Sequence, residues 1–151
     1  MIKIITVGSI KEKYLKDAIE EYTKRLSKYT NIEIIEVKDE GLVEPQKAME
    51  LEGEKIKKHI NPRDYVITLE IEGKELSSEE FASKINQIFL ETSNITFIIG
   101  GSYGISPEIK NMSNFKLSFS KMTFPHQLFR VNLLEQIYRA YKINNKESYH
   151  K

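Results

Sequence analysis

The sequence predicts an α/β fold built on one mostly parallel sheet with helices on both faces. Short β-branched runs alternate with segments of helical periodicity, an order that is typical of strands joined by covering helices. The most apolar run, residues 95–100 (ITFIIG), indicates a strand that is buried on both faces. The chain has 151 residues, the size of one domain, and no repeat or obvious linker, so residues 1–151 are predicted to form a single domain.

The first half of the chain alternates three predicted strands with two predicted helices. The strands are short runs rich in β-branched residues at positions 2–7, 32–37 and 65–71. Residues 11–29 carry apolar side chains at helical spacing, which predicts an amphipathic helix. A second, highly charged helix is predicted over residues 44–60, and Asn61-Pro62 ends it.

The second half continues the same alternation. Ser77 and Glu80 form a capping-box pattern that predicts a helix through about residue 91. Ser106, followed by a proline and a glutamate, predicts the start of a short helix. Thr123 is expected to cap a final helix that the chain enters through Pro125. Strands are predicted at residues 95–100 and 115–119.

Composition narrows the class of protein. Apolar residues make up 40% of the chain, which favours a folded core over disorder. The chain has no cysteine, which excludes disulfides, thiolate nucleophiles and cysteine metal sites. No run has the length of a membrane span, and the start of the chain has no signal-peptide layout, so we expect the mature protein to begin at Met1. A cytoplasmic protein is predicted.

Charge is unevenly distributed along the chain. Residues 116–151 carry seven basic and two acidic side chains, a net charge of +5, whereas the other 115 residues carry 16 basic and 20 acidic ones, a net charge of −4. Such asymmetry is compatible with a C-terminal end that faces nucleic acid. It is equally compatible with a solvated helix followed by a lysine-rich tail.

Three strand ends have unusual composition. In an open parallel sheet, ligands collect beyond the carboxyl ends of the strands. The glycine loop at residues 100–104 fits close approach of a ligand, but it matches neither a dinucleotide fingerprint nor a P-loop, and a structural turn would use the same glycines. Residues 68–73 (TLEIEG) and 118–128 (SFSKMTFPHQL) form the other two ends.

The stretch at residues 118–128 contains more apolar side chains than a strand-to-helix turn needs. Met122 and Phe124 could line a flat apolar slot in which main-chain groups read the edges of a base-like ring. The alternative is that both side chains belong to the core.

No protein nucleophile or metal site is predicted. The three histidines, His59, His126 and His150, are dispersed and show no metal-ligand spacing. No GxSxG elbow occurs either. Any reaction is therefore expected to depend on the positioning of a reactive cofactor.

Four segments together resemble a known family. IIGGSYG, LSFSKMTFPHQLFRVNLLEQIYRAYKI, the terminal YHK and KEKY near the start resemble the ribosomal RNA large-subunit methyltransferase H family, essentially from Met1 to Lys151. The resemblance implies the SPOUT fold, an α/β sheet whose C-terminal segment is threaded into a trefoil knot. It also implies S-adenosylmethionine-dependent methylation of N3 of pseudouridine 1915 in 23S ribosomal RNA, by a homodimer that acts on the assembled ribosome.

The resemblance implies where the cofactor binds. The family's cofactor loops fall on residues at all three strand ends: Leu69, Gly100, Phe119, Ser120, Lys121, Met122, Thr123 and Phe124. No site is transferred to residues 40–62.

Pseudouridine N3 carries a proton that must leave before or during methylation. The titratable candidates are His126, Tyr149 and His150, and Arg130 could instead stabilise the developing anion. The tail that holds Tyr149 and His150 is expected to fold toward the cofactor pocket. Two alternatives stay open, a SPOUT methyltransferase that acts on transfer RNA and a non-catalytic ribosome-associated binding protein.

Overall fold

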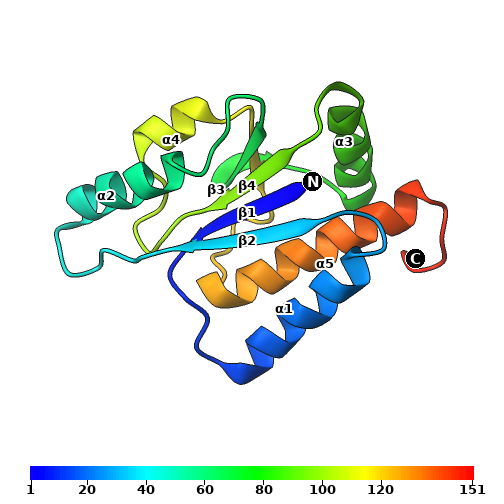
Figure 1. Cartoon of the computed structure of the whole chain (residues 1–151), viewed down its shortest axis with the longest axis horizontal. Helices are drawn as coiled ribbons and strands as arrows, with labels where there is room; N and C mark the ends of the chain where they lie inside the picture. Colours follow the sequence, from blue (N-terminus) through cyan, green and yellow to red (C-terminus); the bar gives the residue numbers. More distant parts are fainter.

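Five strands and five helices alternate along the chain, as Figure 1 shows, in a computed structural model that describes residues 1–151. The elements are β1 (Ile2–Val7), α1 (Lys13–Leu26), β2 (Ile32–Val37), α2 (Pro45–Lys57), β3 (Tyr65–Glu75), α3 (Ser78–Glu91), β4 (Ile95–Ile99), α4 (Pro107–Met112), β5 (Phe115–Ser118) and α5 (His126–Asn144). No helix is long and apolar enough to cross a membrane.

The strands form one sheet in the order β2-β1-β4-β3-β5. Every neighbouring pair is parallel, which confirms the predicted parallel sheet. The carboxyl ends of all five strands therefore lie at the same edge of the sheet. Because β4 lies between β1 and β3, and β3 lies between β4 and β5, the last three strands in sequence are neighbours in space.

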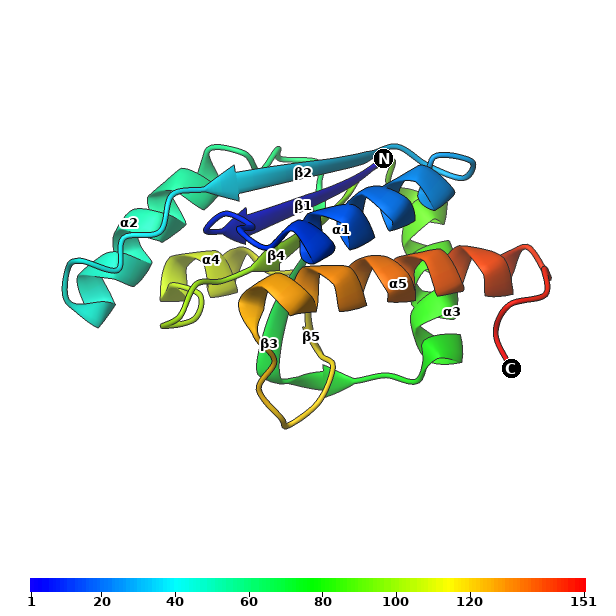
Figure 2. The same cartoon turned by 90° about the horizontal axis from the view of Figure 1, so that it is seen from below.

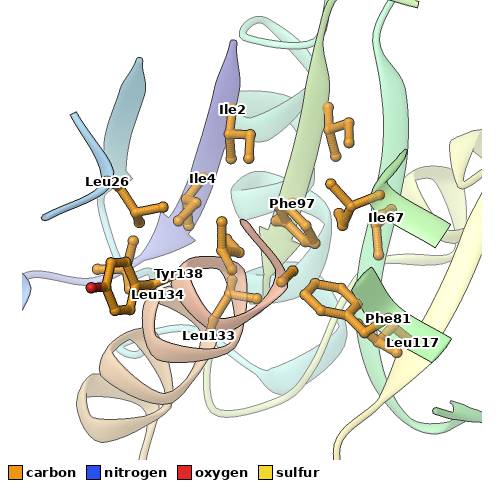
Figure 3. Close-up of a cluster of buried hydrophobic side chains, with 14 of the residues drawn as sticks. Ile2, Ile4, Leu26, Ile67, Phe81, Phe97, Leu117, Leu133, Leu134 and Tyr138 are labelled. Carbon is orange, nitrogen blue, oxygen red and sulfur yellow. The ribbon is translucent and has the colours of Figure 1, made fainter. Parts of the chain in front are cut away.

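Helices cover both faces of the sheet, as predicted (Figures 1 and 2). On one face α1, α3 and α5 pack over the larger core, where Leu133, Leu134 and Tyr138 of α5 belong to the same buried cluster as Ile4 of β1 and Phe97 of β4 (Figure 3). On the other face α2 and α4 cover a smaller core that includes Ile56 and Ile109. All five residues of β4 are buried, because this central strand has helices on both sides.

Two predicted helix caps are confirmed. The Glu80 N–H donates to Ser77 Oγ at 3.0 Å, and the Ser77 N–H donates back to Glu80 Oε1 at 2.8 Å, which completes the capping box of α3. Ser106 accepts from the Ile109 N–H at 3.4 Å, ahead of the first-turn proline of α4.

The predicted cap of the last helix is wrong. α5 begins at His126 with Pro125 as its N-cap, and no side chain caps it. Thr123 lies two residues too early, in a segment that turns away from β5 before the helix starts. The first helix is shorter than the predicted range 11–29, because residues 11 and 12 belong to the connecting loop and residues 27–29 form a turn.

β3 continues to Glu75, four residues beyond the predicted end. Its pairing with β5 shifts register between Leu69 and Lys74, so the intervening residues bulge out of the ladder. Gly73 allows the two strands to approach closely, because a Cβ there would lie 2.7 Å from the Lys116 carbonyl oxygen. The bulge matters for the site described below.

The larger core predicts a measurable stability difference between two leucines. Leu133→Ala removes a fully buried side chain and is expected to lower the free energy of unfolding by about 2–5 kcal/mol. Leu90→Ala is the matched control, since Leu90 is also helical but is 82% exposed and is expected to change stability little. Urea unfolding of both variants tests this, and equal losses would contradict the assignment of the core.

Candidate active site

A cavity of about 430 Å³ lies at the carboxyl edge of the sheet, beyond β3, β4 and β5. The three strand ends that are unusual in composition all contribute to its wall. The residues predicted to bind cofactor line it with the exception of Lys121: Leu69, Gly100, Phe119, Ser120, Met122, Thr123 and Phe124. Parallel pairing brings these segments together, although up to 55 positions separate their residues in sequence, from Leu69 to Phe124.

The glycine loop forms one wall of this cavity. A Cβ on Gly100 would lie 2.8 Å from the backbone of Gly104, so only glycine fits there. Gly104 has a φ of +90°, and its N–H donates to the Gly101 carbonyl at 3.0 Å, which closes a tight turn. The loop is therefore a structural turn that at the same time exposes main chain to the cavity.

The segment between β5 and α5 forms the opposite wall. Phe119 and Phe124 both pack on Phe129 of α5, with ring centroids 4.9 and 5.6 Å apart. Ser120 accepts from the Met122 N–H at 3.0 Å, which bends the segment. Met122 is 77% exposed, so the interpretation of Met122 as a core residue is wrong.

A second cavity of about 680 Å³ adjoins the first. The lining comprises Val7 and Gly8 at the end of β1, residues 36–39 around the end of β2, and the start of α5. The two cavities share only Gly101, Ser102 and His126. His126 therefore lies at their junction, where it places an imidazole side chain.

Arg130 lies in the wall of the second cavity and is 2% exposed. Its Nη2 donates to the carbonyls of Gly8 (2.8 Å) and Val7 (3.2 Å), and its Nη1 forms an ion pair with Glu36 at 2.5 Å. These contacts tie α5 to the end of β1.

The C-terminal tail does not reach the cavity of its own chain, so the expectation that it folds toward that pocket is wrong within one subunit. Tyr149 donates to Glu135 Oε2 at 3.0 Å, and His150 contacts Arg139 (Nδ1, 3.1 Å) and Glu79 (Nε2, 2.6 Å). Glu135 and Arg139 lie roughly 14 and 20 Å along α5 from His126, at 1.5 Å per residue, and Glu79 belongs to the first turn of α3. Figures 1 and 2 show the tail and the segment before α5 at opposite ends of α5.

The tyrosine in the tail is held in its neutral form. Burial, with the adjacent Glu135 carboxylate, raises the pKa of Tyr149 to about 12. In this position it is a hydrogen-bond donor to Glu135.

The structure adds polar residues to the first cavity that sequence reasoning missed. Glu70 accepts from the Thr68 hydroxyl at 2.6 Å and lies 3.6 Å from the Lys110 ammonium. The composition of residues 68–73 was the only available signal for Glu70. Lys110 has no local signal, because only the packing of α4 beside β3 brings it to the cavity.

A buried carboxylate, Glu52 of α2, lies beneath the glycine loop, within residues 40–62 for which no site was predicted. It is 3% exposed, and its Oε2 accepts from the Glu40 N–H at 3.0 Å. Its Oε1 has no partner, and a Cβ on Gly101 would lie 2.9 Å from that atom. Burial, and then the nearby Asp39 carboxylate, raise the pKa of Glu52.

No group of three or more histidine or carboxylate side chains is arranged to hold a metal ion. The polar groups of each cavity include hydroxyls, at least one lysine, His126 and two carboxylates.

The whole chain matches one family model. Residues 1–150 match the family described as predicted SPOUT methyltransferases, and the chain belongs to this family. The fold is thus that of a SPOUT methyltransferase, an enzyme whose methyl donor is S-adenosylmethionine. The methyltransferase prediction is confirmed, while the trefoil knot stays a prediction.

Individual relatives within this family carry a more specific name. The chain is 59% identical to a putative ribosomal RNA large subunit methyltransferase H of Methanococcus maripaludis, over 99% of each chain. It is 57% identical to the ribosomal RNA large subunit methyltransferase H of Bifidobacterium adolescentis, again over 99% of each chain. These relatives confirm the family resemblance noted in the sequence.

One solved structure supports the fold alone. A probable methylase family protein from Haemophilus influenzae superposes with a TM-score of 0.56 at 12% identity, over 99% of this chain and 70% of that one.

The buried Glu52 predicts a pH-dependent stability. Because its pKa is raised in the folded state, folding favours the protonated carboxyl; this contribution is complete at pH values below the carboxyl's ordinary pKa and is lost as pH rises through the raised value. Glu52→Gln stays neutral, so it is expected to melt above the wild type at pH 8 and close to it at pH 4. Thermal unfolding at both pH values measures this.

Glu54→Gln is the matched control, since Glu54 is exposed on the same helix. It is expected to leave the pH dependence of melting unchanged. An equal effect of both substitutions at pH 8 would contradict the role of burial.

Proposed function

We propose that this chain uses S-adenosylmethionine to methylate N3 of pseudouridine 1915 in 23S ribosomal RNA, with the assembled ribosome as substrate. The observation that carries the proposal is the convergence of the three strand ends on one cavity. Relatives named ribosomal RNA large subunit methyltransferase H, matched over nearly their full length, support ribosomal RNA as the substrate.

The first cavity fits the cofactor. Its volume, about 430 Å³, lies in the range of small-molecule sites, and its wall is largely apolar. We assign Leu69, Met122 and Phe124 to the adenine, with the main chain at Gly100 reading polar edges. Gly100 leaves no room for a side chain, so the backbone itself can contact a ligand. When bound, S-adenosylmethionine supplies a methyl group that is already activated.

The task of the protein is then to align the target base and to deal with its N3 proton. Alignment by itself can be worth about 7–11 kcal/mol of the barrier. We assign the removal of the N3 proton to His126, because this side chain lies where the two cavities meet. We assign Arg130 to the positioning of α5, and with it of His126, since carbonyls and Glu36 already occupy its two terminal nitrogens.

We propose a homodimer in which each active site is shared. Tyr149 and His150 lie too far from the cavity of their own chain, so they can contribute to catalysis only in the site of a second copy. The exposed apolar side chain of Leu128, in the first turn of α5, is available for such a contact. A single chain has a net charge of only +1, which by itself attracts RNA weakly. The proposed dimer would bring two C-terminal segments of net charge +5 together, and this concentration of positive charge favours RNA binding.

One experiment separates this function from its rivals. The protein is incubated with labelled S-adenosylmethionine and with assembled ribosomes, free ribosomal RNA or transfer RNA. We expect label on the ribosomes, at N3 of pseudouridine 1915. Label on transfer RNA alone would favour the transfer RNA enzyme, and label on none of them would favour a non-catalytic binding protein.

Gly100→Ala tests the cofactor site. The added Cβ would lie 2.8 Å from the Gly104 backbone, so the loop must shift, and we expect cofactor affinity to fall at least about tenfold. Calorimetric titration with S-adenosylmethionine measures this. Gly41→Ala is the control, since its Cβ would meet only the flexible Asp39 side chain, and wild-type affinity is expected. Unchanged affinity in both variants would place the cofactor elsewhere.

Deletion of residues 149–151 tests the shared site. The truncated chain is expected to bind cofactor normally and to lose most methylation. Mixing it with Gly100→Ala chains should restore part of the activity, because a mixed dimer combines one intact cavity with one intact tail. Full activity of the truncated chain would show that the tail plays no part. Failure to restore activity in verified mixed dimers would argue against sharing.

A further inference from the structure

The second cavity has no ligand in the function proposed above. It lies beside the cofactor cavity, at the ends of β1 and β2 and the start of α5, and has a volume of about 680 Å³. Its wall is mainly polar, in contrast to the apolar wall of the first. Ser102 and His126 belong to both walls.

Methyl transfer requires two ligands to meet. The acceptor nitrogen must approach the methyl carbon in line with the bond that breaks, so donor and acceptor occupy adjoining spaces. The first cavity, at about 430 Å³, has room for one cofactor-sized molecule. The acceptor therefore needs an adjoining space, and the second cavity shares its wall with the first.

Charge at the second cavity matches a phosphate-bearing ligand. Lys11 and Lys38 line it, both are exposed, and neither forms an ion pair. Of the two carboxylates in the wall, Glu36 pairs with Arg130, and the exposed Asp39 lies beside the buried Glu52, so the two unpaired lysines outnumber the one free carboxylate. Two unpaired ammonium groups thus remain for the ligand.

A hydrogen bond to the start of α5 holds the backbone of Lys11 beside the second cavity. Its backbone N–H donates to Gln127 Oε1 at 3.2 Å, and Gln127 follows His126 in α5. This contact ties the KEKY segment, residues 11–14, to the junction of the two cavities. The KEKY segment otherwise has no role in the cofactor site.

We propose that the second cavity binds the methyl-accepting nucleotide of the RNA, with Lys11 and Lys38 on its flanking phosphates. The target base reaches the first cavity at Ser102 and His126. This inference rests on the proposed RNA methyltransferase function and adds the site and two of its binding residues.

The test compares two double substitutions with the same loss of charge. Lys11→Ala/Lys38→Ala removes the proposed phosphate contacts. Lys24→Ala/Lys58→Ala removes two exposed, unpaired lysines near the ends of α1 and α2, at the opposite edge of the sheet. Each protein is measured for S-adenosylmethionine affinity, for methylation of assembled ribosomes, and for cofactor-free binding of those ribosomes at several salt concentrations.

We expect the Lys11/Lys38 variant to bind cofactor normally and to lose at least about tenfold in kcat/KM. The slope of its logarithmic ribosome-binding constant against the logarithm of salt concentration should become shallower by roughly 0.7 for each lost phosphate contact, a value typical of single strands. The Lys24/Lys58 variant should keep the wild-type slope. Equal slopes and equal kcat/KM for the two variants would overturn the proposal.

Ser9→Trp provides a second variant that leaves the charges in place. Ser9 is exposed and lines only the second cavity, so the added indole is expected to fill it. Methylation should be lost while S-adenosylmethionine still binds, and retained methylation would overturn the proposal. If the wild type itself methylates no ribosomal RNA, the proposed function fails; if it does and these variants match the control, only the acceptor site fails.

Discussion

The parallel pairing of β3 with both β4 and β5 is the constraint on which the cofactor cavity depends. It places the ends of three strands side by side, and each end contributes one wall. The register shift between Leu69 and Lys74 then pushes Glu70, Ile71 and Glu72 out of the ladder, where they line the cavity instead of pairing with β5. A regular β3–β5 ladder would have used these positions for pairing, so the irregularity is part of the site.

A second constraint orients the last helix. The buried Arg130 donates to main-chain carbonyls at the end of β1, which ties this strand to the first turns of α5. An unpaired guanidinium at this depth would be costly, so the contact holds the helix in one position. His126, four residues earlier, is thereby held between the two cavities. The same helix carries the tail at its far end, which makes the two ends of α5 suited to two different active sites in the proposed dimer.

The glycine loop combines structural and functional demands at one place. Its tight turn needs glycine at Gly100 and Gly104, and the packing of Glu52 beneath it leaves little space at Gly101. A loop so closely packed from below presents a defined main-chain surface to a ligand above. Burial of a carboxylate lowers stability at high pH, a cost of the kind that proteins often accept near functional sites.

Local patterns in the sequence determined the elements, because strand and helix periodicity and the caps at Ser77 and Ser106 depend on neighbouring residues. Composition also marked the three strand ends, and the motif at residues 118–128 identified the family. The tertiary structure decided what no local pattern records. Hydrogen bonds such as those of Arg130 to Gly8, 122 positions apart, and the contact of Glu52 with Gly101 arise only when strand order brings distant segments together. The position of the tail is likewise a tertiary property. Its contacts with Glu135, Arg139 and Glu79 hold it away from the cavity of its own chain, and no local pattern records them.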